Sequence, residues 1–75
     1  EKAVETAEFT ELLNGFLGSL PQLSRRIFVQ RYWYLLSVRE IALDNSLSEA
    51  AVKMRLSRAR AELKELLIKE GVFYG

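Results

Sequence analysis

The stretch SEAAVKMRLSRARAEL, residues 48–63, decides the fold class, because its apolar residues recur at the spacing of an α-helix. At about 100° per residue, the apolar residues of this stretch and of the four that follow it fall on one stripe, made of Val52, Leu56, Ala59, Leu63, Leu66 and Leu67. Small or slender residues lie on the opposite side: Ala50, Met54, Ser57 and Ala61. Ser48 is a favourable N-cap, so we predict a helix over residues 48–70 that buries the apolar stripe.

The rest of the chain has the same three- and four-residue spacing of apolar residues and no strand-like alternation. Pro21 suits the first turn of a helix, and Ser37 with Glu40 fits a capping box. Asp44, Asn45 and Ser46 favour a turn because their side chains compete for backbone hydrogen bonds. The sequence therefore predicts an all-α, four-helix domain with helices at about residues 5–18, 21–35, 38–45 and 48–70.

Length and composition limit the class of protein. The 75 residues suffice for one small domain, and with 49% hydrophobic and 28% charged residues the chain should fold. We expect residues 1–75 to form a single domain cut from a longer protein, because the first residue is Glu1 rather than Met. No stretch is typical of a signal peptide or a membrane span, which favours a cytoplasmic location.

Catalysis is not expected. The chain has no Cys and no His, which excludes thiol nucleophiles, His-based acid–base chemistry and Cys/His zinc sites. Glu8 with Glu11, and Glu62 with Glu65, are like-charge pairs typical of an exposed helix surface. Nucleotide-binding glycine loops, nucleophile elbows and metal-ligand spacings are absent from the sequence, so we predict no enzymatic activity and no cofactor.

Charge is distributed by segment, although the formal net charge is only +1. Residues 1–20 carry a balance of −3, residues 21–60 a balance of +5, and residues 61–75 a balance of −1. Within the basic segment, Lys53 flanks the slender side of the last helix on one edge, and Arg55 and Arg58 flank it on the other. Such a face suits the DNA major groove, where cations neutralise phosphates and small residues permit close approach.

A basic helical face can also be merely solvated, and the neighbouring elements bear on that alternative. The face follows a short predicted helix and a turn of three or four residues, which is the arrangement of a helix-turn-helix. In that motif the first helix supports the second across the groove. This context favours DNA binding over a solvated surface.

Three blocks of the sequence resemble region 4 of bacterial sigma factors, most closely the extracytoplasmic-function type. They are LPQLSRRIFVQRY (residues 20–32), LSVREIA (residues 36–42) and SEAAVKMRLSRARAEL (residues 48–63). The helix-turn-helix of response regulators is the nearest alternative, since it shares the EIA and VK elements. It usually differs from this chain at residues 55–58, which read RLSR.

The resemblance implies a domain that binds the −35 promoter element and docks on the flap of the RNA polymerase β subunit. By motif position, the residues expected to contact DNA are Ser48, Lys53, Arg55, Ser57 and Arg58, with Arg39 as a further phosphate contact. Glu49, Ala50 and Met54 occupy positions that often read bases, yet none offers the bidentate fork that Arg gives guanine. Base specificity is therefore expected to be weak or to depend on DNA shape.

Two glycines that are frequent in the family are absent. The turn has Asn45 and Ser46 where Leu-Gly is usual, and Leu35 replaces another glycine. A glycine takes a positive φ at no steric cost, so Ser46 must be strained or the turn must rearrange.

Protein-binding surfaces are predicted from aromatic and apolar residues. Trp33 with Tyr32 and Tyr34 could form a docking patch, and the favoured alternative is that at least Tyr32 lies in the core. The resemblance places a groove for a polymerase helix or an anti-sigma factor between the first two helices, lined by Phe16, Leu20, Val29 and Leu36. A protein-interaction module that has lost its DNA readout is the second functional hypothesis.

Overall fold

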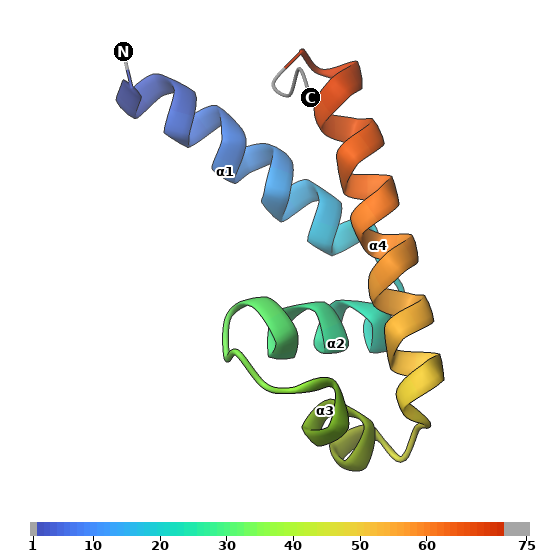
Figure 1. Cartoon of the computed structure of the whole chain (residues 1–75). Coiled ribbons are helices and arrows are strands. Elements are labelled where there is room, and N and C mark those ends of the chain that lie inside the picture. The colour runs from blue at the N-terminus through green and yellow to red at the C-terminus, as the bar shows by residue number, and fades with distance from the viewer. Residues whose placement is uncertain (1, 72–75) are drawn as a thin grey trace.

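Four α-helices make up the part of the chain that the structure describes (Figure 1). The structure is a computed structural model that describes the backbone of residues 2–71 and the side chains of residues 8–71. The helices are α1 (Lys2–Ser19), α2 (Gln22–Tyr32), α3 (Val38–Asn45) and α4 (Glu49–Lys69). No strand occurs within residues 2–71, so the predicted all-α, four-helix fold is confirmed.

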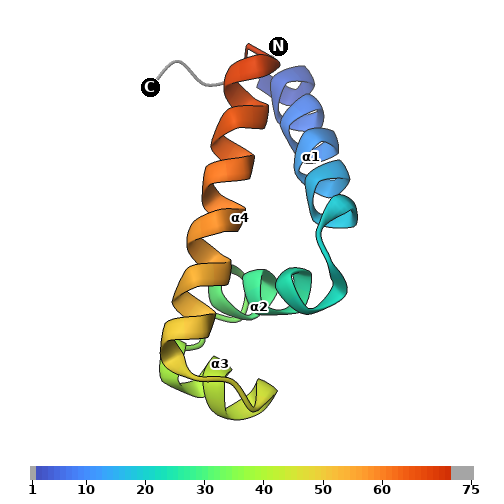
Figure 2. The same ribbon diagram turned by 90° about the vertical axis from the view of Figure 1, so that its right-hand side faces the viewer.

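Helix α4 is the axis of the fold. Helices α2 and α3 pack against its N-terminal half, and the C-terminal end of α1 approaches its middle (Figures 1 and 2). From there α1 and α4 extend beyond the α2–α3 layer, so the molecule is elongated, with a longest dimension of 42 Å. Neither α1 nor α4, the two longest helices of the described chain, is apolar enough to cross a membrane.

The core lies where α2, α3 and α4 meet. Ile27, Ile41 and Val52 are fully buried and come one from each of these helices. The remaining buried residues are Phe16, Leu20, Phe28, Ala42, Leu56 and Ala59. The buried or half-buried state of the whole apolar stripe of α4 confirms the predicted orientation of that helix.

Two predicted helices have different bounds in the structure. Helix α1 begins at Lys2 rather than at about residue 5, and it ends at Ser19, one residue beyond the predicted end. Helix α2 ends at Tyr32 rather than near Leu35, because the amides of Trp33 and Tyr34 both donate to the Val29 carbonyl and close the helix. Leu35 then has a φ of 57°, which no right-handed helix accommodates.

Candidate nucleic-acid interface

Side-chain caps fix the start of both helices of the predicted helix-turn-helix. The Glu40 amide donates to Ser37 Oγ over 3.0 Å, and the Ser37 amide donates to Glu40 Oε1 over 2.8 Å, which is the predicted capping box. At the start of α4, the Ala51 amide donates to Ser48 Oγ over 3.0 Å. These caps confirm the predicted starts of α3 and α4.

The turn between α3 and α4 depends on a left-handed serine. Ser46 has φ 56° and ψ 44°, in the αL region that glycine usually occupies. The Leu47 amide donates to the Ala42 carbonyl over 2.9 Å, which satisfies one of the last carbonyls of α3. The sequence predicted either a strained Ser46 or a rearranged turn. The structure shows the first, since the turn is kept and Ser46 has the strained left-handed backbone.

A polar network joins α3 to α2 on the surface. Asp44 Oδ2 accepts from Arg26 Nη2 over 3.0 Å and from Gln30 Nε2 over 2.6 Å. Asn45 Nδ2 donates to Gln30 Oε1 over 2.9 Å. Hydrogen bonds from Arg26 and then Gln30 lower the pKa of the Asp44 carboxyl. Desolvation opposes them, and the charge of Arg26 lowers the pKa further. The network therefore adds polar contacts between α2 and α3 to the apolar core that they share.

The side of α4 opposite the core is open to solvent. Met54 is 56% exposed, and Ala50, Ser57 and Ala61 are exposed along the same side. Lys53 and Arg58 are also exposed on this helix, and Glu49 is exposed in its first turn. This surface, defined by Ala50, Lys53, Met54, Ser57, Arg58 and Ala61, is called the outer face of α4 below.

Arg55 is positioned differently from its cationic neighbours. It is half-buried, and its Nη1 donates to Ser24 Oγ of α2 over 3.0 Å. Arg60 is likewise directed toward α2, with Nη1 donating to the Tyr32 hydroxyl over 2.9 Å. The two arginines therefore join α4 to α2, and Arg55 does not lie on the outer face of α4.

Most cations in the described part of the chain have no acidic partner. Within residues 8–71, where side chains are described, the only ion pair is that between Arg26 and Asp44. Among the same residues, Arg39, Lys53 and Arg58 are exposed and form neither an ion pair nor a hydrogen bond to another side chain. A positive surface with free cations on α3 and α4 is suited to a polyanion.

The sequence profile of one family, described as sigma-70, region 4, matches residues 10–63. The chain belongs to this family. A search of curated protein sequences gave no significant match. The matched range includes α2, α3 and the part of α4 that bears the outer face, which are the elements that form the helix-turn-helix.

Membership of the region 4 family sets the general function. Sigma-70 region 4 is a DNA-binding helix-turn-helix of sigma factors, acts in promoter recognition together with RNA polymerase, and is not a catalytic family. The match favours the sigma factor over the response regulator, the two resemblances considered from the sequence. The extracytoplasmic-function subtype stays a prediction.

The four residues predicted to line a protein-binding groove of region 4 do not share one surface. Phe16 and Leu20 are each only 5% exposed, because they pack in the core between α1, α2 and α4. Val29 and Leu36 instead line a hollow of about 590 Å³ on the other side of α2. The sequence could not separate these pairs, since apolar spacing alone does not distinguish a groove from a core.

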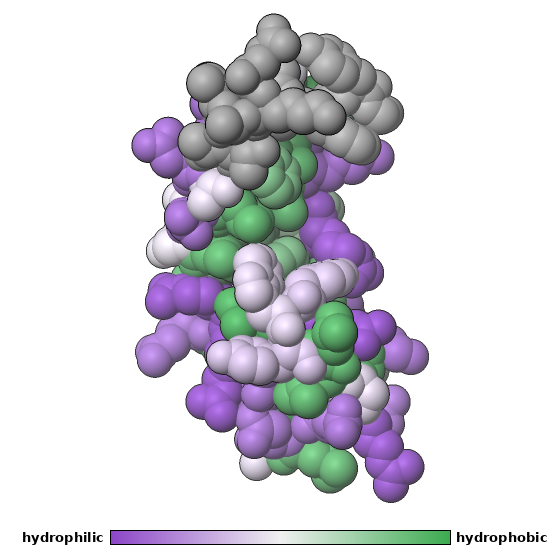
Figure 3. Space-filling model, turned by 90° about the vertical axis from the view of Figure 1, so that its left-hand side faces the viewer, coloured by the Kyte–Doolittle hydropathy of each residue, from purple (hydrophilic) through white to green (hydrophobic). Residues whose placement is uncertain are grey.

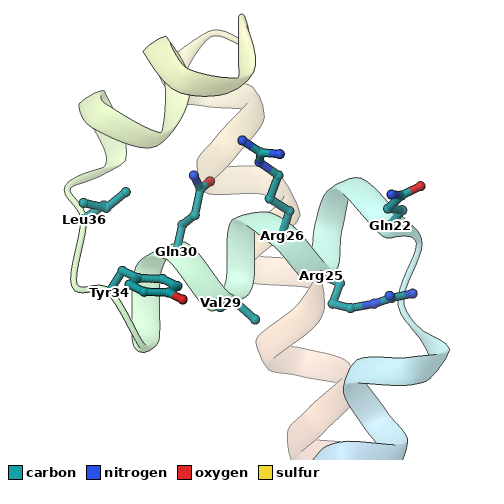
Figure 4. A pocket seen from close by; sticks show the side chains of 7 residues that line it. All are labelled: Gln22, Arg25, Arg26, Val29, Gln30, Tyr34 and Leu36. Atoms are coloured by element: carbon teal, nitrogen blue, oxygen red, sulfur yellow. The ribbon is translucent and has the colours of Figure 1, made fainter.

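Apolar and basic side chains together line the hollow on α2. Its remaining walls come from Gln22, Arg25, Arg26, Gln30 and Tyr34, which Figure 4 shows along α2 and the α2–α3 connection. Arg25 is oriented by α1, because its Nε donates to the Leu17 carbonyl over 3.0 Å. Tyr34 had a sequence signal as a possible docking aromatic, whereas the contribution of Gln30 had none.

Tyr32, the last residue of α2, is more exposed than predicted. Tyr32 is 41% exposed rather than buried, since its ring lies on the surface of the core with its centroid 4.7 Å from that of Phe28. Trp33, Tyr34 and Leu35 are still more exposed. Apolar and weakly polar side chains gather in the middle of this side of the molecule, which Figure 3 shows as green and pale spheres.

Proposed function

We propose that the outer face of α4 binds the −35 promoter element in the major groove. Lys53 and Arg58 would neutralise phosphates on either side of the groove, with Arg39 of α3 and the N-terminal end of α4 at Ser48 as further phosphate contacts. Ala50, Met54 and Ser57 would meet base edges, and Glu49 would lie beside them in the first turn. The free cations on an otherwise uncovered helix face are the observation that supports this proposal.

Salt dependence of duplex binding tests the role of the cations. Each lysine or arginine that neutralises a phosphate contributes about 0.9 to the slope of log affinity against log salt. We expect Lys53→Ala and Arg58→Ala each to weaken binding to promoter duplex and to reduce this slope by about 1. Fluorescence anisotropy of labelled duplex over a salt series measures both quantities.

Lys64→Ala is the matched control, because Lys64 is also an exposed α4 lysine but lies about 16 Å further along the helix axis than Lys53. It should change the slope by much less than Lys53→Ala. Equal slopes for the parent chain, Lys53→Ala and Arg58→Ala would rule out DNA binding by this face.

A protein-interaction module with little DNA readout is the second candidate function. It is supported by the hollow on α2, whose apolar lining residues Val29, Tyr34 and Leu36 suit an amphipathic helix. In region 4 such a partner would be the β flap of RNA polymerase, and an anti-sigma factor would compete for the same surface. Both partners and promoter DNA occur in the bacterial cytoplasm, which is the location we propose for the chain.

Chemical-shift mapping separates the two functions. A peptide of the β flap should shift the amides around Val29 and Tyr34, whereas promoter duplex should shift those of the outer face of α4. Val29→Glu should abolish the peptide response and leave the duplex response unchanged, because Val29 lies on α2 outside the outer face. If duplex produces no shifts on α4 at low salt while the peptide binds, the second function stands alone.

A further inference from the structure

Met54 is the largest apolar side chain on the outer face of α4, and it is 56% exposed. Its neighbours along this face are Ala50 one turn before it, and Ser57 and Ala61 about one and two turns after it. None of these neighbours is large enough to cover the thioether. In DNA-bound region 4, the side chain would therefore face the floor of the groove.

Polar base readers are scarce beside Met54. The guanidinium of Arg55, the next residue, is directed to Ser24 on α2 and away from the outer face. Ser57 has only a hydroxyl, which pairs with several base edges without strong preference. Lys53 and Arg58 are the strong donors of the outer face, and they lie at its edges, where the proposed function assigns them to phosphates. The centre of the face therefore offers apolar contact.

The major groove contains one exposed apolar group, the C5 methyl of thymine. A thioether placed over the polar edge of guanine, cytosine or adenine would displace water from donors and acceptors without replacing their hydrogen bonds. Placed on a thymine methyl, it buries apolar surface from both molecules. Ala50 lies about 6 Å along the axis, close to two base-pair steps, and is small enough for the helix to approach the groove floor.

We infer that Met54 is a specificity-determining residue that selects a thymine methyl within the −35 element. The inference depends on the proposed binding of DNA by the outer face of α4 and names the chemical group that this face recognises. Replacing thymine by uracil removes only the C5 methyl and leaves every hydrogen-bonding group in place, so it isolates the contact.

The experiment begins with selection of the tightest duplex from a pool randomised over about 10 base pairs, one turn of DNA, at low salt. Each thymine of that duplex is then replaced singly by uracil, and affinities are measured for the parent chain. At one or two positions the loss should be about three- to fivefold, the value expected for one buried methyl. At the other thymines the affinity should not change.

Variants of Met54 assign the effect to the side chain. The measured quantity is the ratio of the affinity for the thymine duplex to the affinity for the uracil duplex. Met54→Ala should bring this ratio close to one at those positions, whereas Met54→Leu should keep it at the parent value. Ile68→Ala, which removes another exposed apolar side chain of α4 about 21 Å away, should leave the ratio unchanged.

Three results would overturn the inference. The first is an affinity ratio near one at every thymine of the parent complex, and the second is a selected duplex that contains no thymine. The third is an unchanged ratio in Met54→Ala, which would show that the methyl acts through DNA shape rather than through Met54. The salt slope reports separately on the proposed function. If Lys53→Ala still lowers that slope while uracil has no effect, the face binds DNA and only the methyl contact is wrong. If no duplex binds, both proposals fail.

Discussion

Arg55 Nη1 donates a hydrogen bond of 3.0 Å to Ser24 Oγ, and so links α4 to α2 across 31 positions of sequence. Motif position alone would assign Arg55 to DNA, together with Lys53 and Arg58. The geometry gives it a different neighbour, since a guanidinium held against α2 is not free to extend from the outer face of α4. We therefore propose that Arg55 positions α4 against α2.

Loss of this hydrogen bond should lower stability more than DNA affinity. Arg55→Ala and Ser24→Ala should each lower the free energy of unfolding by about 1 kcal/mol, the net value of one such bond. The double variant should lose little more than either single variant, because both changes remove the same interaction. Urea denaturation followed by circular dichroism measures these values.

The salt slope of duplex binding distinguishes positioning from direct contact. Neither Arg55→Ala nor Ser24→Ala should reduce the slope as Lys53→Ala does. A slope lower by about 1 in Arg55→Ala, with Ser24→Ala unchanged, would show instead that Arg55 reaches a phosphate in the complex.

Ser46→Gly should stabilise the domain. Ser46 has a φ of 56°, and an L-residue in the left-handed region costs roughly 1–2 kcal/mol, part of which is offset by the greater flexibility of an unfolded glycine. We expect a gain of about 0.5–1 kcal/mol, or about 3–6 °C in Tm for a domain of this size, measured by thermal unfolding.

Ser46→Ala is the control for that gain, because it removes the hydroxyl without relieving the backbone. It should not stabilise the domain. Leu35→Gly, at a φ of 57°, should act in the same direction as Ser46→Gly. A loss of stability in Ser46→Gly would mean that the serine side chain contributes more than the strain costs.

Local patterns in the sequence predicted most of the fold. The capping box at Ser37 and the cap at Ser48 join groups only three residues apart, and the apolar stripe of α4 repeats within a single helix, so spacing alone identifies them. The same reasoning identified the residues of the outer face, because exposure on an amphipathic helix follows from its core stripe. The missing glycine at Ser46 indicated strain for a similar reason.

The spacing of residues along the sequence could not predict the contacts between helices. The hydrogen bond from Arg55 to Ser24 and the network around Asp44 join residues that are far apart in the chain. The sequence near each of these residues does not identify its partner. Phe16 and Leu20 were assigned to a groove because a core face and a docking face have the same composition. The position of a side chain relative to other helices decides its role in each of these cases.

Asp44 should make the α2–α3 contact sensitive to acid. Its folded pKa is below the ordinary value of about 3.9, so its contribution to stability is present above that pH and disappears as pH falls through the folded pKa. Asp44→Asn should be less stable than the parent near neutral pH. The difference between the two should narrow below about pH 3.9, as measured by urea denaturation over a pH series.

Arg26 provides the control for this pH effect, because Arg26, like Gln30, donates a hydrogen bond to the Asp44 carboxylate. The stability of Arg26→Ala should therefore change less with pH, over this acid range, than the stability of the parent. A constant difference between Asp44→Asn and the parent from neutral to acid pH would contradict a role for the ionised carboxylate.

Ile41 and Leu43 provide a matched pair on α3, two residues apart but with opposite surroundings. Ile41 is fully buried between α2 and α4, whereas Leu43 is 72% exposed. Ile41→Ala should cost about 2–4 kcal/mol, a large share of the roughly 4–11 kcal/mol expected for a domain of this size. Leu43→Ala should change stability by less than about 0.5 kcal/mol.

The same pair tests how α3 serves DNA binding. Ile41→Ala removes the apolar contact that holds α3 against α4, so duplex affinity should fall even where circular dichroism shows the helices still formed. Leu43→Ala should bind duplex as the parent does, because Leu43 is neither in the core nor on the outer face of α4. Weaker polymerase binding by Leu43→Ala, with stability and duplex affinity unchanged, would place the exposed side of α3 in a protein interface instead.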